Sequence, residues 1–60
     1  MERMDIFYHV LCELANYHLD DLDEYEEAVK CTEFLMTRSD DITREEINKC
    51  LFNRYEDYLY

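Results

Sequence analysis

The sequence predicts an all-α fold: a small three-helix bundle in which residues 1–60 form one acidic helical domain. The 60 residues include no Gly and no Pro, the two residues that most disfavour helix interiors. Hydrophobic residues recur every three or four positions along three segments, roughly 2–19, 22–38 and 44–59. Short polar stretches separate these segments, Asp20-Asp21 after the first and Ser39-Asp40-Asp41 after the second.

The first helix is expected over residues 2–19, with a wide hydrophobic face. At 100° per residue, one face gathers the residues that we expect to be buried: Met4, Phe7, Tyr8, Leu11, Leu14, Ala15 and His18. Three further residues widen this face on one side: Ile6, Val10 and Tyr17. A hydrophobic arc of this width favours contact with two neighbouring helices.

The second helix is expected over residues 22–38, and its start is ambiguous. Either Asp21 with Glu24 or Asp23 with Glu26 can form a capping pair. Arg38 in the last turn suits the negative end of the helix dipole. The expected buried stripe comprises Leu22, Tyr25, Ala28, Val29, Thr32, Leu35 and Met36.

The third helix, residues 44–59, has the clearest start. Thr43 and Glu46 form a capping box, and Ile42 can pack on Ile47 as a hydrophobic staple. Arg54 interrupts the hydrophobic face, so we expect its stem to lie along that face and its head to pair with a carboxylate. The residues expected to face inward are Ile47, Leu51, Tyr55 and Tyr58, with Cys50 at the edge.

Composition limits the class of protein. A chain with 48% hydrophobic residues is too apolar for a disordered acidic tail. Its hydrophobic runs are too short for a membrane span, and its first residues lack the pattern of a secretion signal. Three cysteines, an odd number, suggest reduced thiols and a cytoplasmic location. Because a short chain buries little surface alone, homodimerisation is one way to complete the bundle.

No catalytic or metal-binding signature is present. The sequence has no Gly-rich phosphate loop, and its only serine is Ser39, between two predicted helices. Cys12, Cys31 and Cys50 each fall near the middle of a predicted helix, where three thiols could converge. Zinc sites usually contain closely spaced cysteine pairs, which are lacking here. We therefore expect no enzymatic activity, no metal and no cofactor.

The net charge of −10 favours a protein partner over other ligands. Residues 1–33 contain ten acidic and two basic residues and thus carry −8 of that charge. Such a field disfavours nucleic acid and anionic membranes as direct ligands, and it favours a basic protein surface, or solubility alone. The expected acidic contact residues are Glu2, Glu13, Asp20, Asp21, Asp23, Glu24, Glu27 and Glu33.

Several hydrophobic residues do not fit the predicted buried faces. Phe34 falls on the polar side of the second helix, and Phe52 and Leu59 form a second strip on the third, with Tyr55 between them. Aromatic anchors of this kind are typical of protein interfaces. The expected hydrophobic contact residues are Tyr17, Tyr25, Phe34, Phe52, Tyr55 and Leu59.

Two hypotheses for function follow. The first is a small acidic protein-binding module, an inhibitor or regulator that engages the basic surface of a nucleic-acid-binding protein. In its sharpest form the protein is a DNA mimic, by analogy with small acidic proteins of phages and mobile elements, because DNA-binding grooves carry Lys and Arg spaced to meet phosphates. The alternative is a structural or assembly protein that acts through a hydrophobic helix interface, either in a homodimer or as a subunit contact.

Overall fold

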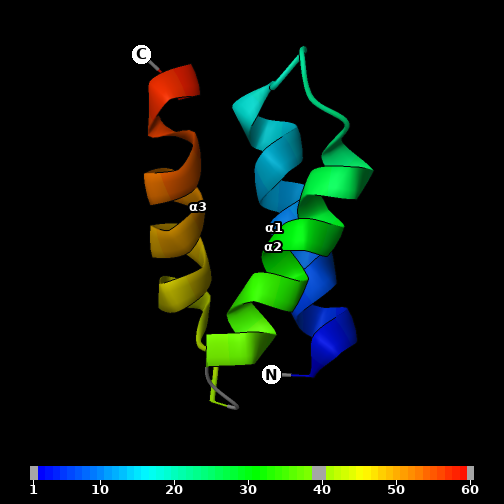
Figure 1. The fold of residues 1–60 in the computed structure, drawn as a ribbon, viewed down its shortest axis with the longest axis vertical. Coiled ribbons are helices and arrows are strands. Elements are labelled where there is room, and N and C mark those ends of the chain that lie inside the picture. The colour runs from blue at the N-terminus through cyan, green and yellow to red at the C-terminus, as the bar shows by residue number, and fades with distance from the viewer. Residues whose placement is uncertain (1, 39–40, 60) are drawn as a thin grey trace.

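The computed structural model describes residues 2–38 and 41–59, except for the side chain of residue 59. The described chain forms three helices: α1 (Arg3–Tyr17), α2 (Glu24–Arg38) and α3 (Arg44–Leu59). Each helix runs antiparallel to the one before it, so α1 and α3 are parallel (Figure 1). The predicted all-α three-helix bundle is confirmed.

α1 ends earlier than the predicted residue 19. His18 caps the helix in the left-handed region, with φ 55° and ψ 51°, and the chain leaves the helix there. Leu19 then turns back into the core, and its carbonyl oxygen accepts a 3.2 Å hydrogen bond from the Leu22 amide. The expectation that His18 lies on the buried face was wrong, because burying Leu19 requires the helix to stop before it.

Capping side chains fix the starts of α2 and α3. An Asp23 carboxylate oxygen accepts hydrogen bonds from the amides of Tyr25 (3.0 Å) and Glu26 (3.3 Å), which selects the second of the two predicted capping pairs. At α3 the Thr43 hydroxyl oxygen accepts a bond from the Glu46 amide at 3.2 Å, as predicted. Ile42, just before the capping Thr43, and Ile47, in the first turns of α3, are both buried, consistent with the predicted staple.

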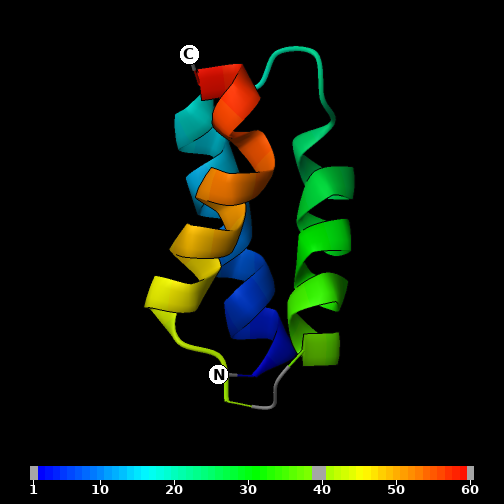
Figure 2. The same ribbon diagram turned by 60° about the vertical axis from the view of Figure 1, so that its left-hand side comes forward.

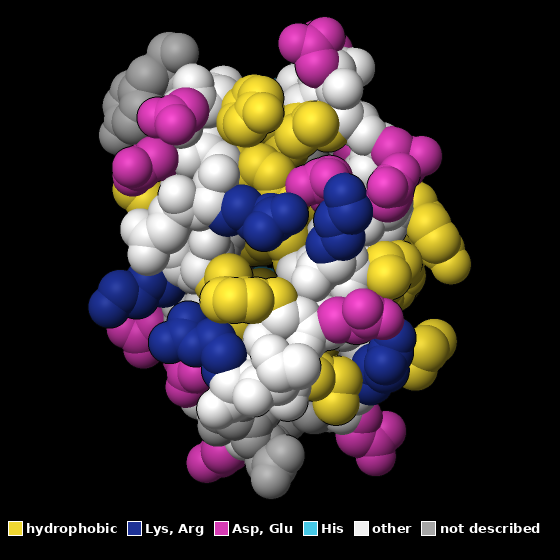
Figure 3. Space-filling view, in the orientation of Figure 1, with side chains coloured by type: hydrophobic (Ala, Val, Ile, Leu, Met, Phe, Trp, Pro, Cys, Tyr) yellow, Lys and Arg dark blue, Asp and Glu magenta, His cyan; other side chains and the backbone are white. Residues whose placement is uncertain are grey.

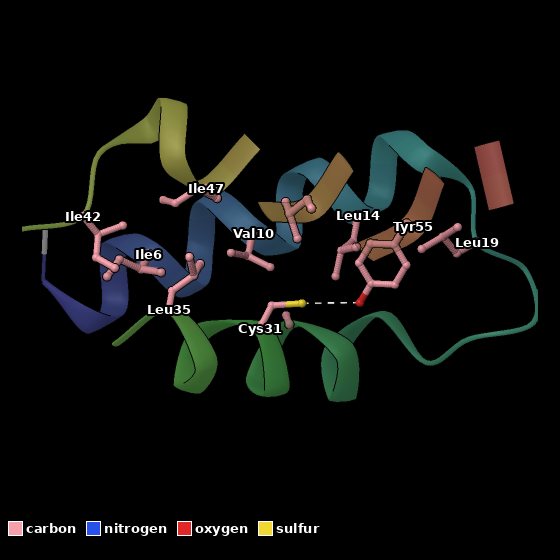
Figure 4. Close-up of a cluster of buried hydrophobic side chains, with 11 residues drawn as sticks. Ile6, Val10, Leu14, Leu19, Cys31, Leu35, Ile42, Ile47 and Tyr55 are labelled. Atoms are coloured by element: carbon pink, nitrogen blue, oxygen red, sulfur yellow. Dashed lines mark hydrogen bonds between the residues drawn. The ribbon is translucent and has the colours of Figure 1, made fainter. Parts of the chain in front are cut away.

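The three helices enclose one hydrophobic core. Both α2 and α3 pack mainly against α1 and contact each other much less (Figure 2). Figure 4 shows Ile6, Leu35 and Ile42 together at one end of this core, with Leu14, Leu19 and Tyr55 at the other. α1 is therefore the central helix, and α2 and α3 are splayed apart on the side away from it.

α1 is rotated relative to the predicted orientation. Ile6, Val10 and Leu14 are buried, whereas Met4 and Tyr8 are 75% and 71% exposed. Ala15, also expected inside, is exposed. Two neighbouring helices cover only part of a hydrophobic arc that is wider than half the helix, and the covered part is the side that carries Ile6, Val10 and Leu14.

The other two helices differ less from expectation. Of the expected stripe on α2, Ala28, Thr32 and Leu35 are buried. Tyr25, Met36 and Tyr58, which were expected inside, are exposed. These three lie at the margins of their helical stripes, where a small bundle has no further element to cover them.

Candidate interaction surfaces

The predicted acidic residues do not form one continuous row. Four of them, Asp20, Asp21, Asp23 and Glu24, lie together where the chain passes from α1 to α2, and we call these four the acidic corner. Glu2 precedes α1 at the opposite end of the bundle (Figure 1). Glu33 lies near that end as well, because its carboxylate accepts a 3.4 Å hydrogen bond from Arg3. Glu13 lies in the second half of α1 and is half-buried.

Glu27 belongs to the interior of the molecule. Its side chain is 12% exposed, and its carboxylate accepts a 2.7 Å hydrogen bond from the Tyr55 hydroxyl. Lys30 Nζ and Arg54 Nη2 each lie 3.6 Å from a carboxylate oxygen. The hydrogen bond from Tyr55, and then the two cations, lower the pKa of Glu27. Its place among the acidic contact residues stays a prediction, but its carboxylate is mostly covered and already paired with Lys30 and Arg54.

Tyr55 joins α3 to α2 from within the core. The side chain is 2% exposed, and its hydroxyl accepts a 3.1 Å hydrogen bond from Arg54 Nε and lies 3.4 Å from Cys31 Sγ (Figure 4). Burial, together with the hydrogen bonds to Cys31 and Glu27, raises the pKa of this hydroxyl, so it stays protonated as a donor. Tyr55 faces inward as predicted, and at 2% exposure it has little surface to offer the partner contact that was also predicted for it.

The head of Arg54 pairs with a carboxylate, as predicted. The guanidinium carbon lies 5.6 Å from the centre of the Tyr55 ring, and the head pairs with Glu27. We call these connected side chains the Glu27–Tyr55–Arg54 network. It is the polar link between two helices that otherwise contact each other little.

The remaining hydrophobic contact residues differ in exposure. Phe34 and Phe52 are 49% and 44% exposed, and Tyr25 is exposed next to Phe7, with ring centres 5.4 Å apart. Tyr17 is half-buried and packs edge-on against Tyr55. The side chain of Leu59 lies outside the described residues.

A further surface, the outer α1 face, was not expected to be exposed. It consists of Met4, Tyr8, Leu11 and Ala15, of which Leu11 is partly buried. α1 carries three charged residues in fifteen, compared with six in fifteen for α2 and seven in sixteen for α3. The helix with the fewest charges thus carries Met4 and Tyr8, the two large hydrophobic side chains with the highest exposed fractions among the described residues.

A groove runs between α2 and α3, and we call it the α2–α3 groove. It contains two adjoining hollows of about 320 and 340 Å³ that share Arg38, Cys50 and Asn53. The remaining lining residues are Cys31, Phe34, Leu35, Ile42, Glu46, Lys49 and Arg54. In Figure 3, which shows this side of the molecule, dark-blue Lys and Arg side chains extend across the middle of the face around yellow hydrophobic ones.

The cysteines do not combine into a metal site. Cys31 and Cys50 line the same hollow, whereas Cys12 is exposed on α1. Within residues 2–38 and 41–59, no three His, Cys, Asp or Glu side chains are placed to share a metal ion. Burial raises the pKa of the Cys50 thiol, so this cysteine is neutral at physiological pH.

Comparison of the chain with protein-family models, curated proteins and solved structures found no match. None of the described helices is long and hydrophobic enough to span a bilayer. The interaction surfaces must therefore be interpreted from their own chemistry.

Sequence reasoning missed the α2–α3 groove for a simple reason. Its cations, Arg38, Lys49 and Arg54, are distributed over two helices and meet only after folding. The one available signal was the charge imbalance, because four of the six basic residues fall after residue 33. Nothing in that imbalance indicates that three of the four line one groove.

Proposed function

We propose that this protein acts by binding rather than by catalysis, and that it is an assembly module whose outer α1 face pairs with the same face of a second copy. The spacing of the exposed side chains supports this proposal. Met4, Tyr8, Leu11 and Ala15 follow one another at intervals of four, three and four residues. This is the repeat of a helix that packs along its length against another helix.

Charge favours a second copy as the occupant of this face. In a two-fold symmetric pair the same residues approach one another, so a charged face would place like charges together. The outer α1 face itself has no charged side chain, and Asp5 and Arg44 border it in a hollow that Tyr8 also lines. α2 and α3 carry about twice as many charges, so α1 is the helix that suits self-pairing.

Wild-type protein is expected to form dimers at micromolar to submillimolar concentration, which corresponds to about −5 to −8 kcal/mol of binding free energy. Tyr8→Glu is expected to weaken this association at least about tenfold, because two carboxylates would meet in the paired face. Sedimentation equilibrium over a range of concentrations measures both values. A reductant keeps disulfides of the exposed Cys12 from contributing.

Tyr58→Glu is the matched control, because Tyr58 is an exposed tyrosine on α3. This variant adds the same charge to the molecule and should dimerise like wild type. If Tyr8→Glu and Tyr58→Glu weaken dimerisation equally, α1 has no specific role in it. If the wild-type protein stays monomeric at millimolar concentration, self-pairing is refuted. Circular dichroism checks that both variants keep their helices.

A second candidate is the binding of a basic protein surface by the acidic corner. Four carboxylates within five residues favour it, although Asp23 also caps α2. Glu27 and Glu33 already have cationic partners, which reduces the set available for imitating nucleic acid. This second candidate is therefore limited to a local contact between the acidic corner and a basic, nucleic-acid-binding protein.

For this candidate we expect capture of such a protein from the producing cells at low salt, release by a salt gradient, and competition by duplex DNA. The doubly neutralised variant Asp20→Asn/Asp21→Asn should lose most of the captured protein. Glu56→Gln/Asp57→Asn removes the same charge from α3 and should retain it. Capture that duplex DNA does not reduce would exclude an imitation of nucleic acid.

A further inference from the structure

We propose that the α2–α3 groove is a binding site for an acidic amphipathic helix of a partner protein. The proposal does not depend on pairing through α1, which involves another side of the molecule. It rests on the meeting of three cations and a hydrophobic floor in the gap between two helices. In a protein of net charge −10, half of the six basic residues line this groove.

Two of the cations are already held in position. The Arg38 guanidinium carbon lies 5.7 Å from the centre of the Phe34 ring, and Arg54 is held by the Tyr55 ring and by Glu27. A side chain that is ordered before binding loses less conformational entropy when its partner arrives. Arg38 and Lys49 line the same hollow, and no ion pair of either is found among the described residues.

The floor of the groove is hydrophobic. Phe34 is half-exposed there, and the thiols of Cys31 and Cys50 lie beside it. Among the described lining residues, the three cations Arg38, Lys49 and Arg54 outnumber the single carboxylate, Glu46. A ligand that suits this lining carries carboxylates along its flanks and aliphatic or aromatic residues between them.

The shape of the groove favours a helix as the ligand. The lining residues on α3 recur at positions 46, 49, 50, 53 and 54, along roughly two turns or about 12 Å of helix. Because α2 and α3 both pack on α1 and little on each other, a fourth helix in the groove would complete a four-helix arrangement. When a helix binds in a groove, side chains three or four positions apart on that helix contact the groove.

The overall negative charge does not prevent this binding at physiological salt. The Debye length there is about 8 Å, so carboxylates at the far corner of a 30 Å molecule are strongly screened. The cations of the groove act at contact distance, where charge-assisted hydrogen bonds are strongest. Local charge therefore determines which ligand the groove accepts.

The test uses two synthetic amphipathic helices of roughly 14 residues. Both carry Leu at every third or fourth position, and they differ only in having Glu or Lys on the flanks. At about 0.15 M salt, the Glu peptide is expected to shift the backbone amide signals of residues 31–38 and 46–54 saturably in NMR spectra. The Lys peptide should shift the acidic corner instead.

Arg38→Gln and Lys49→Glu should each weaken binding of the Glu peptide, the second by at least about tenfold. Arg44→Glu is the matched control for Lys49→Glu, since Arg44 lies on α3 outside the groove. It makes the same charge change and should bind like wild type. Circular dichroism verifies the fold of each variant.

Three results would overturn the proposal. One is the absence of saturable shifts with the Glu peptide, and another is equal weakening by Lys49→Glu and Arg44→Glu. The third is a shift of the groove signals when the protein is concentrated alone, because the occupant would then be a second copy of this chain rather than a partner's helix.

Discussion

Leu51→Ala is expected to lower the free energy of unfolding by about 3 kcal/mol, the largest effect of any substitution considered for this protein. Leu51 is fully buried in the core, and a 60-residue fold has only about 3–9 kcal/mol to lose. The variant is expected to be largely unfolded or close to its midpoint at 25 °C. Urea unfolding followed by circular dichroism measures the loss.

The neighbouring residue provides the control. Phe52 is 44% exposed, so Phe52→Ala should lower the unfolding free energy by roughly 1 kcal/mol, clearly less than Leu51→Ala although it removes a larger side chain. If Leu51→Ala does not fold at all, Ile47→Val at another fully buried position gives a measurable loss of about 1 kcal/mol. Similar losses for Leu51→Ala and Phe52→Ala would mean that α3 packs with a different face.

Tyr55→Phe is expected to cost about 2 kcal/mol while leaving the core filled. The ring remains, but the hydroxyl that serves Glu27, Arg54 and Cys31 is lost. The Glu27 carboxylate, only 12% exposed, would then lack its closest donor. A double-mutant cycle with Glu27→Gln should show strong non-additivity, since both substitutions break the same hydrogen bond.

The same network predicts a defined pH dependence. The folded-state pKa of Glu27 lies below its ordinary value of 4.5, so its carboxylate contributes stability above that value and loses it as pH falls through the folded pKa. Wild type should be more stable than Glu27→Gln by about 1–2 kcal/mol at neutral pH, and this difference should shrink as pH falls below 4.5 and through the folded-state pKa of Glu27. Unfolding at a series of pH values measures it.

Glu26→Gln is the control for this titration. Glu26 is one residue away, but its side chain is 65% exposed and pairs with Lys30 at the surface. Glu26→Gln should change the free energy of unfolding by less than about 0.5 kcal/mol over the same pH range. If the difference in unfolding free energy between wild type and Glu27→Gln stays constant as far below pH 4.5 as the protein remains folded, the charge of Glu27 does not contribute to stability.

Features governed by local contacts were predictable. The start of α3 at residue 44 follows from a hydroxyl and an amide three residues apart, and the structure contains that bond. The pairing of the Arg54 head also followed, because a charge on a hydrophobic face must reach a partner or water. The atoms that start α3 lie within a few residues of one another, whereas the carboxylate that Arg54 reaches, Glu27, lies on α2 and could not be named from the sequence.

The orientation of α1 depended on more than its own sequence. Tyr8 and Val10 both belong to its hydrophobic arc, and no property of the isolated helix decides which one is buried. The positions of α2 and α3 decide it, covering Val10 and leaving Tyr8 exposed. The α2–α3 groove has the same origin, because Arg38 and Lys49 meet across two helices.

The sequence by itself determined the fold class, the start of α3 and the net charge, because each of these depends on composition or on residues a few positions apart. The tertiary structure alone decided which carboxylates are neutralised, which hydrophobic residues remain exposed, and where the few cations gather. Glu27 and Tyr55 illustrate the reason. They are 28 residues apart in the chain and 2.7 Å apart in the fold, and such a distance is set by the packing of whole helices.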